Sequence, residues 1–204
     1  MNILAIGSHP DDIEYGCGGT LLKLNRQNHP IYLYVATGGD FGGDPSIRMK
    51  EQEESAREIG ARRVFWGGYK DTQIPMSQDL IANIERVIHQ VKPDFIFVHY
   101  PDDTHQDHRI LSNATITATR YIRNFLFYEG PTTQNFSPSV YVDIEETLER
   151  KIQLLKIHHS QVTKTNIGDM TVMELAQSTA NFRGIQGRVK YAEAFCPSRL
   201  FMLI

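Results

Sequence analysis

Short apolar runs alternate with longer amphipathic segments along this chain. The short runs are rich in β-branched and aromatic side chains and predict buried strands at residues 3–7, 31–37, 64–66, 95–98 and 140–144. The longer segments predict helices at residues 18–27, 47–59, 80–91, 108–123 and 148–157. One more helix is expected after residue 170, and a closing strand near residues 199–203. Strands that alternate with helices are typical of an α/β protein with a mostly parallel sheet flanked by helices.

Nothing in the sequence divides the chain, because it contains no internal repeat, low-complexity tract or linker. The polar, proline-containing residues 130–138 indicate a surface loop. We therefore expect a single domain over residues 1–204, and 41% hydrophobic residues are enough for a full core.

The charge balance limits the classes of partner. A net charge of −3, from 21 basic and 24 acidic side chains, does not favour nucleic-acid binding. We expect no membrane span and no signal peptide, since long apolar runs and a basic leader are missing from the sequence. The two cysteines, Cys17 and Cys196, are too few for a disulfide framework. These features together predict a cytoplasmic protein.

A first polar cluster, His9-Pro10-Asp11-Asp12, follows the first predicted strand. Two adjacent carboxylates repel each other, so a cation should compensate their charge. A divalent metal does so well, and histidine with aspartate is a ligand pair that suits zinc. A solvated acidic turn that caps the next helix explains the same residues with only one aspartate. This cluster alone leaves both interpretations open.

A second cluster, His105-Gln106-Asp107-His108, follows the predicted strand at residues 95–98. Two histidines at i and i+3 can share one face of a helix, and Asp107 beside them can orient a ring. Surface histidines next to a helix cap are the alternative. Sites in open α/β sheets form beyond the carboxyl ends of strands, where both clusters are expected. Together they contain the ligand set of one zinc site.

Both clusters, with several other segments, resemble the zinc N-deacetylases of the LmbE and PIG-L type. The resemblance rests on His-Pro-Asp-Asp after the first strand, Gly-Cys-Gly-Gly, Arg-x-x-Glu, Pro-Asp before the fourth strand, His-x-Asp-His after it, and Tyr-Ala-Glu-Ala-Phe near the end. These segments are residues 9–12, 16–19, 48–51, 93–94, 105–108 and 191–195. The resemblance covers nearly the whole chain and implies a Rossmann-like, LmbE-like α/β fold.

The same resemblance implies that His9, Asp12 and His108 bind zinc. Three protein ligands leave one position for water, which is typical of a catalytic rather than a structural site. Iron could occupy the same ligands. A two-metal phosphatase would need further ligands, and the spare candidate, His99, is expected to be structural.

The resemblance also implies roles in catalysis. Asp11 would be the general base. His105, charged near neutral pH, would stabilise the oxyanion and protonate the departing amine, and Asp107 would hold its ring and favour the charged form. Arg48 would lie near the substrate or the oxyanion. Some relatives have a tyrosine that helps to polarise the carbonyl, and here that position is Asp103.

We therefore predict a zinc-dependent hydrolase that removes an N-acetyl group from an N-acetylated amino sugar of the N-acetylglucosamine type or its conjugate. An amidase acting on a sugar–thiol or other amide conjugate is the alternative. A non-catalytic metal- or sugar-binding module is a further one, although binding alone would not need Asp11. Several known members form trimers or hexamers, so the resemblance also implies a homo-oligomer.

Residues around the clusters carry weaker expectations. The glycine-rich residues 38–45 are expected to form a lid over the substrate. Glu51 is a candidate to hold Arg48. Gly18 and Gly19 are expected to let the first helix pack closely on the first strand.

Overall fold

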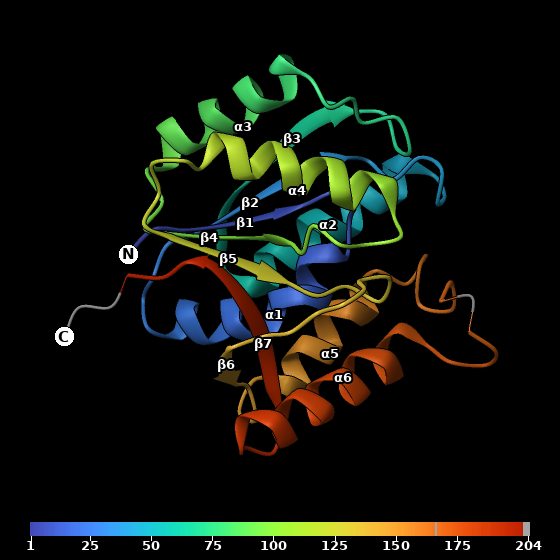
Figure 1. Ribbon diagram of the computed structural model, residues 1–204. Coiled ribbons are helices and arrows are strands. Elements are labelled where there is room, and N and C mark those ends of the chain that lie inside the picture. The colour runs from blue at the N-terminus through green and yellow to red at the C-terminus, as the bar shows by residue number, and fades with distance from the viewer. Residues whose placement is uncertain (166, 202–204) are drawn as a thin grey trace.

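The computed structural model describes residues 1–165 and 167–201 (Figure 1). Within them a seven-stranded sheet has the order β3-β2-β1-β4-β5-β7-β6. The strands are β1 (Ile3–Gly7), β2 (Ile31–Thr37), β3 (Ala61–Tyr69), β4 (Phe95–His99), β5 (Asn124–Tyr128), β6 (Val140–Asp143) and β7 (Ala192–Arg199). The first five run parallel, and β7 is antiparallel to both β5 and β6. The predicted α/β fold with a mostly parallel sheet is confirmed.

Helices cover both faces of the sheet, as Figure 1 shows. They are α1 (Asp12–Arg26), α2 (Pro45–Ile59), α3 (Gln78–Val91), α4 (Gln106–Ala118), α5 (Leu148–Ile157) and α6 (Val172–Gly187). Successive residues of a strand point to opposite faces, so Leu4 and Ile6 of β1 join the core with α3 and α4. Ile3 and Ala5 join the core with α1 and α2 on the other face. Burial on both faces explains why β1 is a continuous apolar run.

The site is positioned by the strand order. The strands β1 and β2 pair on one side, and β4 pairs with β1 on the other, so the direction of winding reverses between β1 and β4. In open α/β sheets this reversal leaves a crevice at the carboxyl ends of the two strands. The segments that follow β1 and β4 are residues 8–12 and 100–108, which contain the two polar clusters.

One strand of the sheet was not expected. The helix predicted at residues 108–123 ends at Ala118, and Asn124–Tyr128 forms β5 between β4 and β7. A short apolar run fits a helix or a strand equally well, and here the pairing with two neighbouring strands decides the matter. The helix α1 also begins at Asp12, before the predicted start at residue 18.

The closing strand lies upstream of its expected position. It is β7, Ala192–Arg199, whereas we predicted residues 199–203, of which 202 and 203 lie outside the described part of the chain. Within the described residues, no helix is both long and apolar enough to cross a membrane. The single domain over residues 1–204 stays a prediction.

Close packing of α1 involves different partners from those expected. A Cβ at Gly16 would lie 2.1 Å from Cδ2 of Tyr128 on β5, and one at Gly19 would lie 3.0 Å from Ile144. At Gly18 the nearest atom would be 3.5 Å away, which is ordinary contact. The predicted contact of Gly18 and Gly19 with the first strand is therefore wrong, and Gly16 is the position where space is tightest.

Candidate active site and metal centre

The loop after β1 turns sharply into α1. Asp11 is the N-cap residue and has φ 92°, in the left-handed region, and within the described residues no helix N–H donates to its side chain. Asp12 accepts a hydrogen bond of 2.7 Å from the backbone N–H of His9. The backbone N–H and the hydroxyl of Thr37 both donate to the carbonyl of Ser8 and fix the loop from β2. The side chain of Asp11 is thus not used as a helix cap.

The loop after β4 is held by its own side chains. The backbone N–H of His105 donates to Oδ1 of Asp103 at 2.8 Å. His105 is the N-cap residue of α4, and its Nδ1 accepts from the backbone N–H of Asp107 at 3.3 Å. His108 follows in the first turn of α4. Local hydrogen bonds therefore fix His105 as the cap of the helix whose first turn contains His108.

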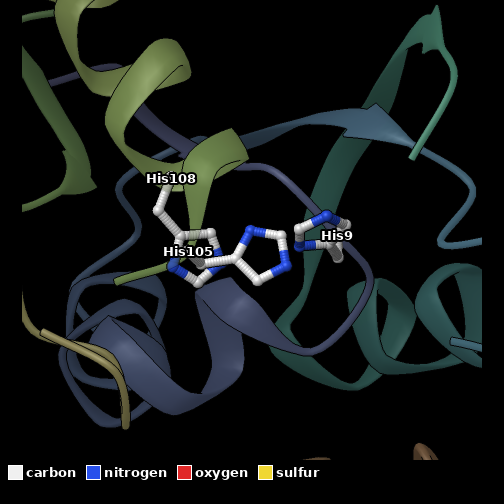
Figure 2. A group of neighbouring side chains, drawn as sticks. All are labelled: His9, His105 and His108. Carbon is white, nitrogen blue, oxygen red and sulfur yellow. The ribbon is translucent and has the colours of Figure 1, made fainter. Parts of the chain in front are cut away.

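The two clusters meet, as Figure 2 shows for three imidazole rings. The ring centroid of His105 lies 4.7 Å from that of His9 and 4.6 Å from that of His108. The carboxylate of Asp12 lies between the outer two rings, with Oδ2 3.3 Å from Nδ1 of His9 and Oδ1 3.4 Å from Nε2 of His108. The three predicted metal ligands, His9, Asp12 and His108, thus come together at one carboxylate.

Buried carboxylates hold the far side of both rings. Nε2 of His9 lies 3.0 Å from Oδ1 of Asp71 and 3.1 Å from Oδ2 of Asp107. Nδ1 of His108 lies 3.3 Å from Oδ2 of Asp103. Each ring therefore directs one nitrogen at an outer carboxylate and the other at Asp12. Metal-binding histidines commonly have this arrangement, since the outer carboxylate fixes the tautomer and the ring orientation.

The charges of the cluster also fit a cation. Burial lowers the pKa of His108, but Asp12 and Asp103 outweigh it and raise the pKa to about 9. The pKa of His9 is also raised, because hydrogen bonds to Asp107 and Asp12 outweigh the effect of burial. The carboxylates thus draw protons onto both rings, and a divalent ion would supply the same positive charge. This donor set fits zinc, whose usual protein ligands are histidine, aspartate and cysteine.

The contacts of Asp107 differ from those we expected. We predicted that its carboxylate holds His105, but Oδ2 contacts His9 and accepts a 2.7 Å hydrogen bond from the backbone N–H of Thr72. Its backbone N–H is the group that reaches His105. Burial and the nearby charge of His108 lower the pKa of His105, the opposite of the expected direction. The neutral ring is therefore favoured, with the proton on Nε2 because Nδ1 accepts a hydrogen bond.

The sequence did not predict Asp71 as part of this cluster, and it predicted only a structural role for His99. Asp71 follows β3, and its position at the carboxyl end of a strand was the signal that could have found it. His99, expected to be structural, ends β4 and is 1% exposed. Its Nε2 lies 3.2 Å from Oδ2 of Asp12, and its ring stacks on His108 at 3.9 Å. Burial lowers the pKa of His99 to about 4, so this ring is neutral beside Asp12 and His108.

Arg48 lies beside Asp11. Its guanidinium is buried, donates to the carbonyls of Gly39 and Pro10 at 2.9 Å each, and lies 3.8 Å from Oδ1 of Asp11. Burial raises the pKa of Asp11 to about 6, although the charge of Arg48 opposes the rise. Glu51 does not hold Arg48 as we expected. Its carboxylate instead accepts hydrogen bonds from the backbone N–H and the hydroxyl of Ser160.

A cavity of about 700 Å³ opens over this cluster. Its floor contains Asp11, Asp12, His105 and His108, and its lining extends to Phe41 and Gly42 of the glycine-rich loop and to Lys164. Phe41 is 80% exposed, although its backbone N–H is fixed by Oδ2 of Asp71 at 3.0 Å. The loop at residues 38–45 thus forms part of the wall of the cavity, and its role as a moving lid stays a prediction.

Comparison with known proteins agrees with this geometry. The family model described as PIG-L, GlcNAc-PI de-N-acetylase, matches residues 4–119. The uncharacterized deacetylase YaiS of Escherichia coli is 35% identical over 167 residues, which cover 78% of this chain and 90% of the relative. A diacetylchitobiose deacetylase of Thermococcus kodakarensis is 26% identical over 185 residues, covering 78% of this chain and 69% of the relative.

A solved structure extends the likeness to three dimensions. The N,N'-diacetylchitobiose deacetylase of Pyrococcus horikoshii, complexed with its inhibitor MPG, superposes with a TM-score of 0.86 at 26% identity. The match covers 96% of this chain and 83% of the other.

Proposed function

We propose, from the premise that this chain belongs to the PIG-L family, that it hydrolyses the acetamide of an N-acetylated amino sugar or its conjugate and releases acetate. The family makes the chain an enzyme that acts on N-acetyl amides. The observation that carries the proposal is the cavity of about 700 Å³, whose floor contains a carboxyl group of raised pKa beside a histidine and aspartate donor set. Ligand pockets of this size commonly hold small molecules.

His9, Asp12 and His108 are the residues that would hold zinc. Support comes from the outer carboxylates, which turn Nδ1 of His9 and Nε2 of His108 toward Asp12. When bound, zinc supplies Lewis-acid chemistry that polarises the amide carbonyl and makes water a nucleophile near neutral pH. Asp11 and His105 line the same cavity and are the residues of this chain that act on the substrate.

Asp11 carries the proton. Its pKa of about 6 leaves most of the carboxyl group ionised at neutral pH and still able to hold a proton during turnover. The carboxylate accepts a proton from the attacking water as the oxygen–carbon bond forms. It then delivers that proton to the amide nitrogen as the carbon–nitrogen bond breaks, so acetate and the free amine are the products. Arg48, 3.8 Å away, favours the ionised form before each turnover.

His105 stabilises the charge that develops on the carbonyl oxygen. The backbone N–H of Asp107 donates to its Nδ1, so the neutral ring has a proton on Nε2 to donate. A neutral imidazole can act in this way in other enzymes. Removing one donor of this kind typically lowers kcat by about 10²–10³-fold. This role replaces the expected charged His105, because the pKa of this ring is lowered.

The test is an Asp11→Asn variant of the zinc-loaded protein, compared with the unchanged protein against a panel of N-acetylated sugars and their conjugates. We expect acetate release by the unchanged protein, and at least a 10²-fold loss in the variant with zinc content retained, since general-base catalysis contributes about 10²–10⁴-fold. Release of other acids but not acetate would favour the amidase alternative. Binding of sugars with no turnover would favour the alternative of a non-catalytic binding module.

Zinc dependence needs its own measurement. Removal of metal by a chelator should abolish acetate release, and added zinc should restore it. Full activity of the metal-free protein would contradict the role of the metal. A cytoplasmic location and assembly into a trimer or hexamer stay predictions, and light scattering of the purified protein measures the assembly directly.

A further inference from the structure

The backbone of Asp11 has a conformation that is costly for any residue with a side chain. Its φ of 92° lies in the left-handed region, which glycine adopts freely and other residues seldom do. Such a conformation persists only when surrounding contacts impose it. The direction in which the Asp11 carboxylate points depends on this backbone, so the contacts that hold it bear on catalysis.

Those contacts come from α2. The backbone N–H of Asp11 donates to Oε1 of Gln52 at 3.2 Å. Gln52 is 0% exposed, although it carries an uncharged polar group. One residue earlier, the carbonyl of Pro10 accepts from Arg48, also on α2, at 2.9 Å. Two side chains of one helix therefore hold the two ends of a single peptide unit, the one that joins Pro10 to Asp11.

A buried carboxylate fixes the orientation of the Gln52 amide. Oε1 of Glu14 accepts from Nε2 of Gln52 at 2.6 Å and from the hydroxyl of Ser55 at 2.7 Å. An ionised carboxylate can only accept hydrogen bonds, so both of these partners donate to it. The NH₂ group of Gln52 must therefore face Glu14, which turns the amide oxygen toward Asp11.

We propose that Gln52 is a positioning residue, which holds the catalytic Asp11 in its left-handed conformation through the amide orientation set by Glu14. This inference rests on the proposed function in so far as Asp11 is the base. Without the Gln52 oxygen, the turn relaxes to negative φ and the carboxylate leaves its place over the floor of the cavity. The chemical step is then slowed, while the metal ligands, which have contacts of their own, stay in place.

The chain offers a matched control for this network. Ser55→Ala removes one buried hydrogen bond to the same Glu14 oxygen and leaves the Gln52–Asp11 contact intact. Gln52→Met preserves the length of the side chain and removes both of its hydrogen bonds. Ser55→Ala loses one hydrogen bond and Gln52→Met loses two, so both should unfold at a lower temperature. If the network only stabilises the fold, the two variants should show similar changes in kcat.

The experiment measures kcat, KM, zinc content and the crystal structure of both zinc-loaded variants. For Gln52→Met we expect kcat to fall about 10²-fold, the loss that a displacement of about 1 Å at a reacting group can cause, with KM and zinc content unchanged. Ser55→Ala should keep kcat within about twofold, on the same reasoning. The structure of Gln52→Met should show Asp11 with negative φ. Equal losses of kcat in the two variants, or an unchanged φ and kcat in Gln52→Met, would overturn the proposal.

Two further measurements distinguish a wrong positioning role for Gln52 from a variant that does not fold and from a protein that releases no acetate. If Gln52→Met does not fold, Gln52→Asn retains a polar side chain but withdraws its oxygen from Asp11, and the same results are expected. In the unchanged protein, the Asp11 amide should exchange slowly with deuterium, and fast exchange would contradict the contact. If the unchanged protein releases no acetate, the proposed function fails, but the φ of Asp11 in the variants still decides the positioning role.

Discussion

Oδ2 of Asp107 lies 3.1 Å from Nε2 of His9 and also accepts a hydrogen bond from the backbone N–H of Thr72. The side chain of Asp107 is fully buried, so water does not compete for this carboxylate. Nε2 of His9 must donate to it, so Nδ1, which lies 3.3 Å from Oδ2 of Asp12, is the nitrogen that can exchange its proton for a metal ion. Asp107 therefore selects the nitrogen of His9 that is free to bind a metal ion.

An Asp107→Asn variant should bind zinc about 10–100-fold more weakly, the usual cost of losing an outer carboxylate of a metal-bound histidine. The neutral amide is a weaker acceptor and can also present its NH₂ group, so it no longer fixes the tautomer of His9. Competition with a chromophoric chelator measures the change in Kd.

The control for this variant is Asp102→Asn. This carboxylate belongs to the same loop after β4, but its Oδ2 accepts from the side chain of Asn135 at 2.7 Å. Zinc affinity should be unchanged there. If Asp107→Asn bound zinc as tightly as the unchanged protein, the orienting role of Asp107 would be wrong.

The inner strands were predictable because burial on both faces requires a continuous apolar run in the sequence. The bounds of β1 and β2 agree with the apolar runs at residues 3–7 and 31–37. The strand β7 has no such continuous apolar run, since it contains Glu193, which is buried against Lys151 of α5 at 2.6 Å and accepts hydrogen bonds from two backbone N–H groups of α1. A contact between residues 42 positions apart is invisible to a local pattern.

The residues of the site also include some that the sequence predicted and others that it did not. Residues 9–12 and 105–108 were predictable as motifs, and the switch in strand order explains why they meet. Gln52 was not predictable, because a glutamine in a charged helix has no local signature. For Asp71 the sequence offered one weak signal, its position after the carboxyl end of β3. Their roles depend on the register between β2 and β3 and on the packing of α2 against α1.

Phe41 is suited to bind one face of a sugar ring, since it is 80% exposed at the cavity while its backbone is fixed by Asp71. Phe41→Ala should raise KM for N-acetylated sugars about 2–10-fold with kcat unchanged, which corresponds to the roughly 0.5–1.5 kcal/mol of an aromatic contact. Phe41→Tyr should restore the unchanged KM. Steady-state kinetics with one sugar substrate measures all three proteins.

Tyr121→Ala provides a control for the loss of an exposed aromatic ring, because Tyr121 is 85% exposed and lines a different cavity. Its KM should equal that of the unchanged protein. A Phe41→Ala variant with normal KM would mean that the ring does not contact the sugar.

Two glycines of α1 should respond to alanine in opposite directions. At Gly16 the new methyl group would lie 2.1 Å from the Tyr128 ring, which cannot easily move because its hydroxyl donates to the carbonyl of Ile6 at 2.7 Å. Overpacking of this kind costs about 1–3 kcal/mol. At Gly18 there is room, so alanine should stabilise the helix by about 0.5–1 kcal/mol. Urea unfolding of both variants measures the difference, and a stabilised Gly16→Ala would contradict the packing described.

The stability contributed by His158 should depend on pH. Burial lowers the pKa of this ring, but the Glu14 carboxylate, with Asp11 and Glu51, outweighs it, so the pKa is raised in the folded protein. Nε2 of His158 lies 3.6 Å from Oε1 of Glu14. A raised pKa means that the folded protein binds the proton more tightly than the unfolded chain, whose histidines titrate near about 6.5.

The sign of the effect follows from this linkage. The stabilisation is complete below about pH 6.5 and is lost as the pH rises through the raised pKa of His158. The free energy of unfolding of the unchanged protein minus that of His158→Gln should therefore be largest at low pH and should shrink as the pH is raised. Urea unfolding of both proteins at equal metal content measures this difference. His89→Gln, which removes an exposed histidine of α3, controls for titration of the unfolded chain. A difference that stays constant or grows with pH would mean that the charged ring of His158 does not stabilise the folded protein through Glu14.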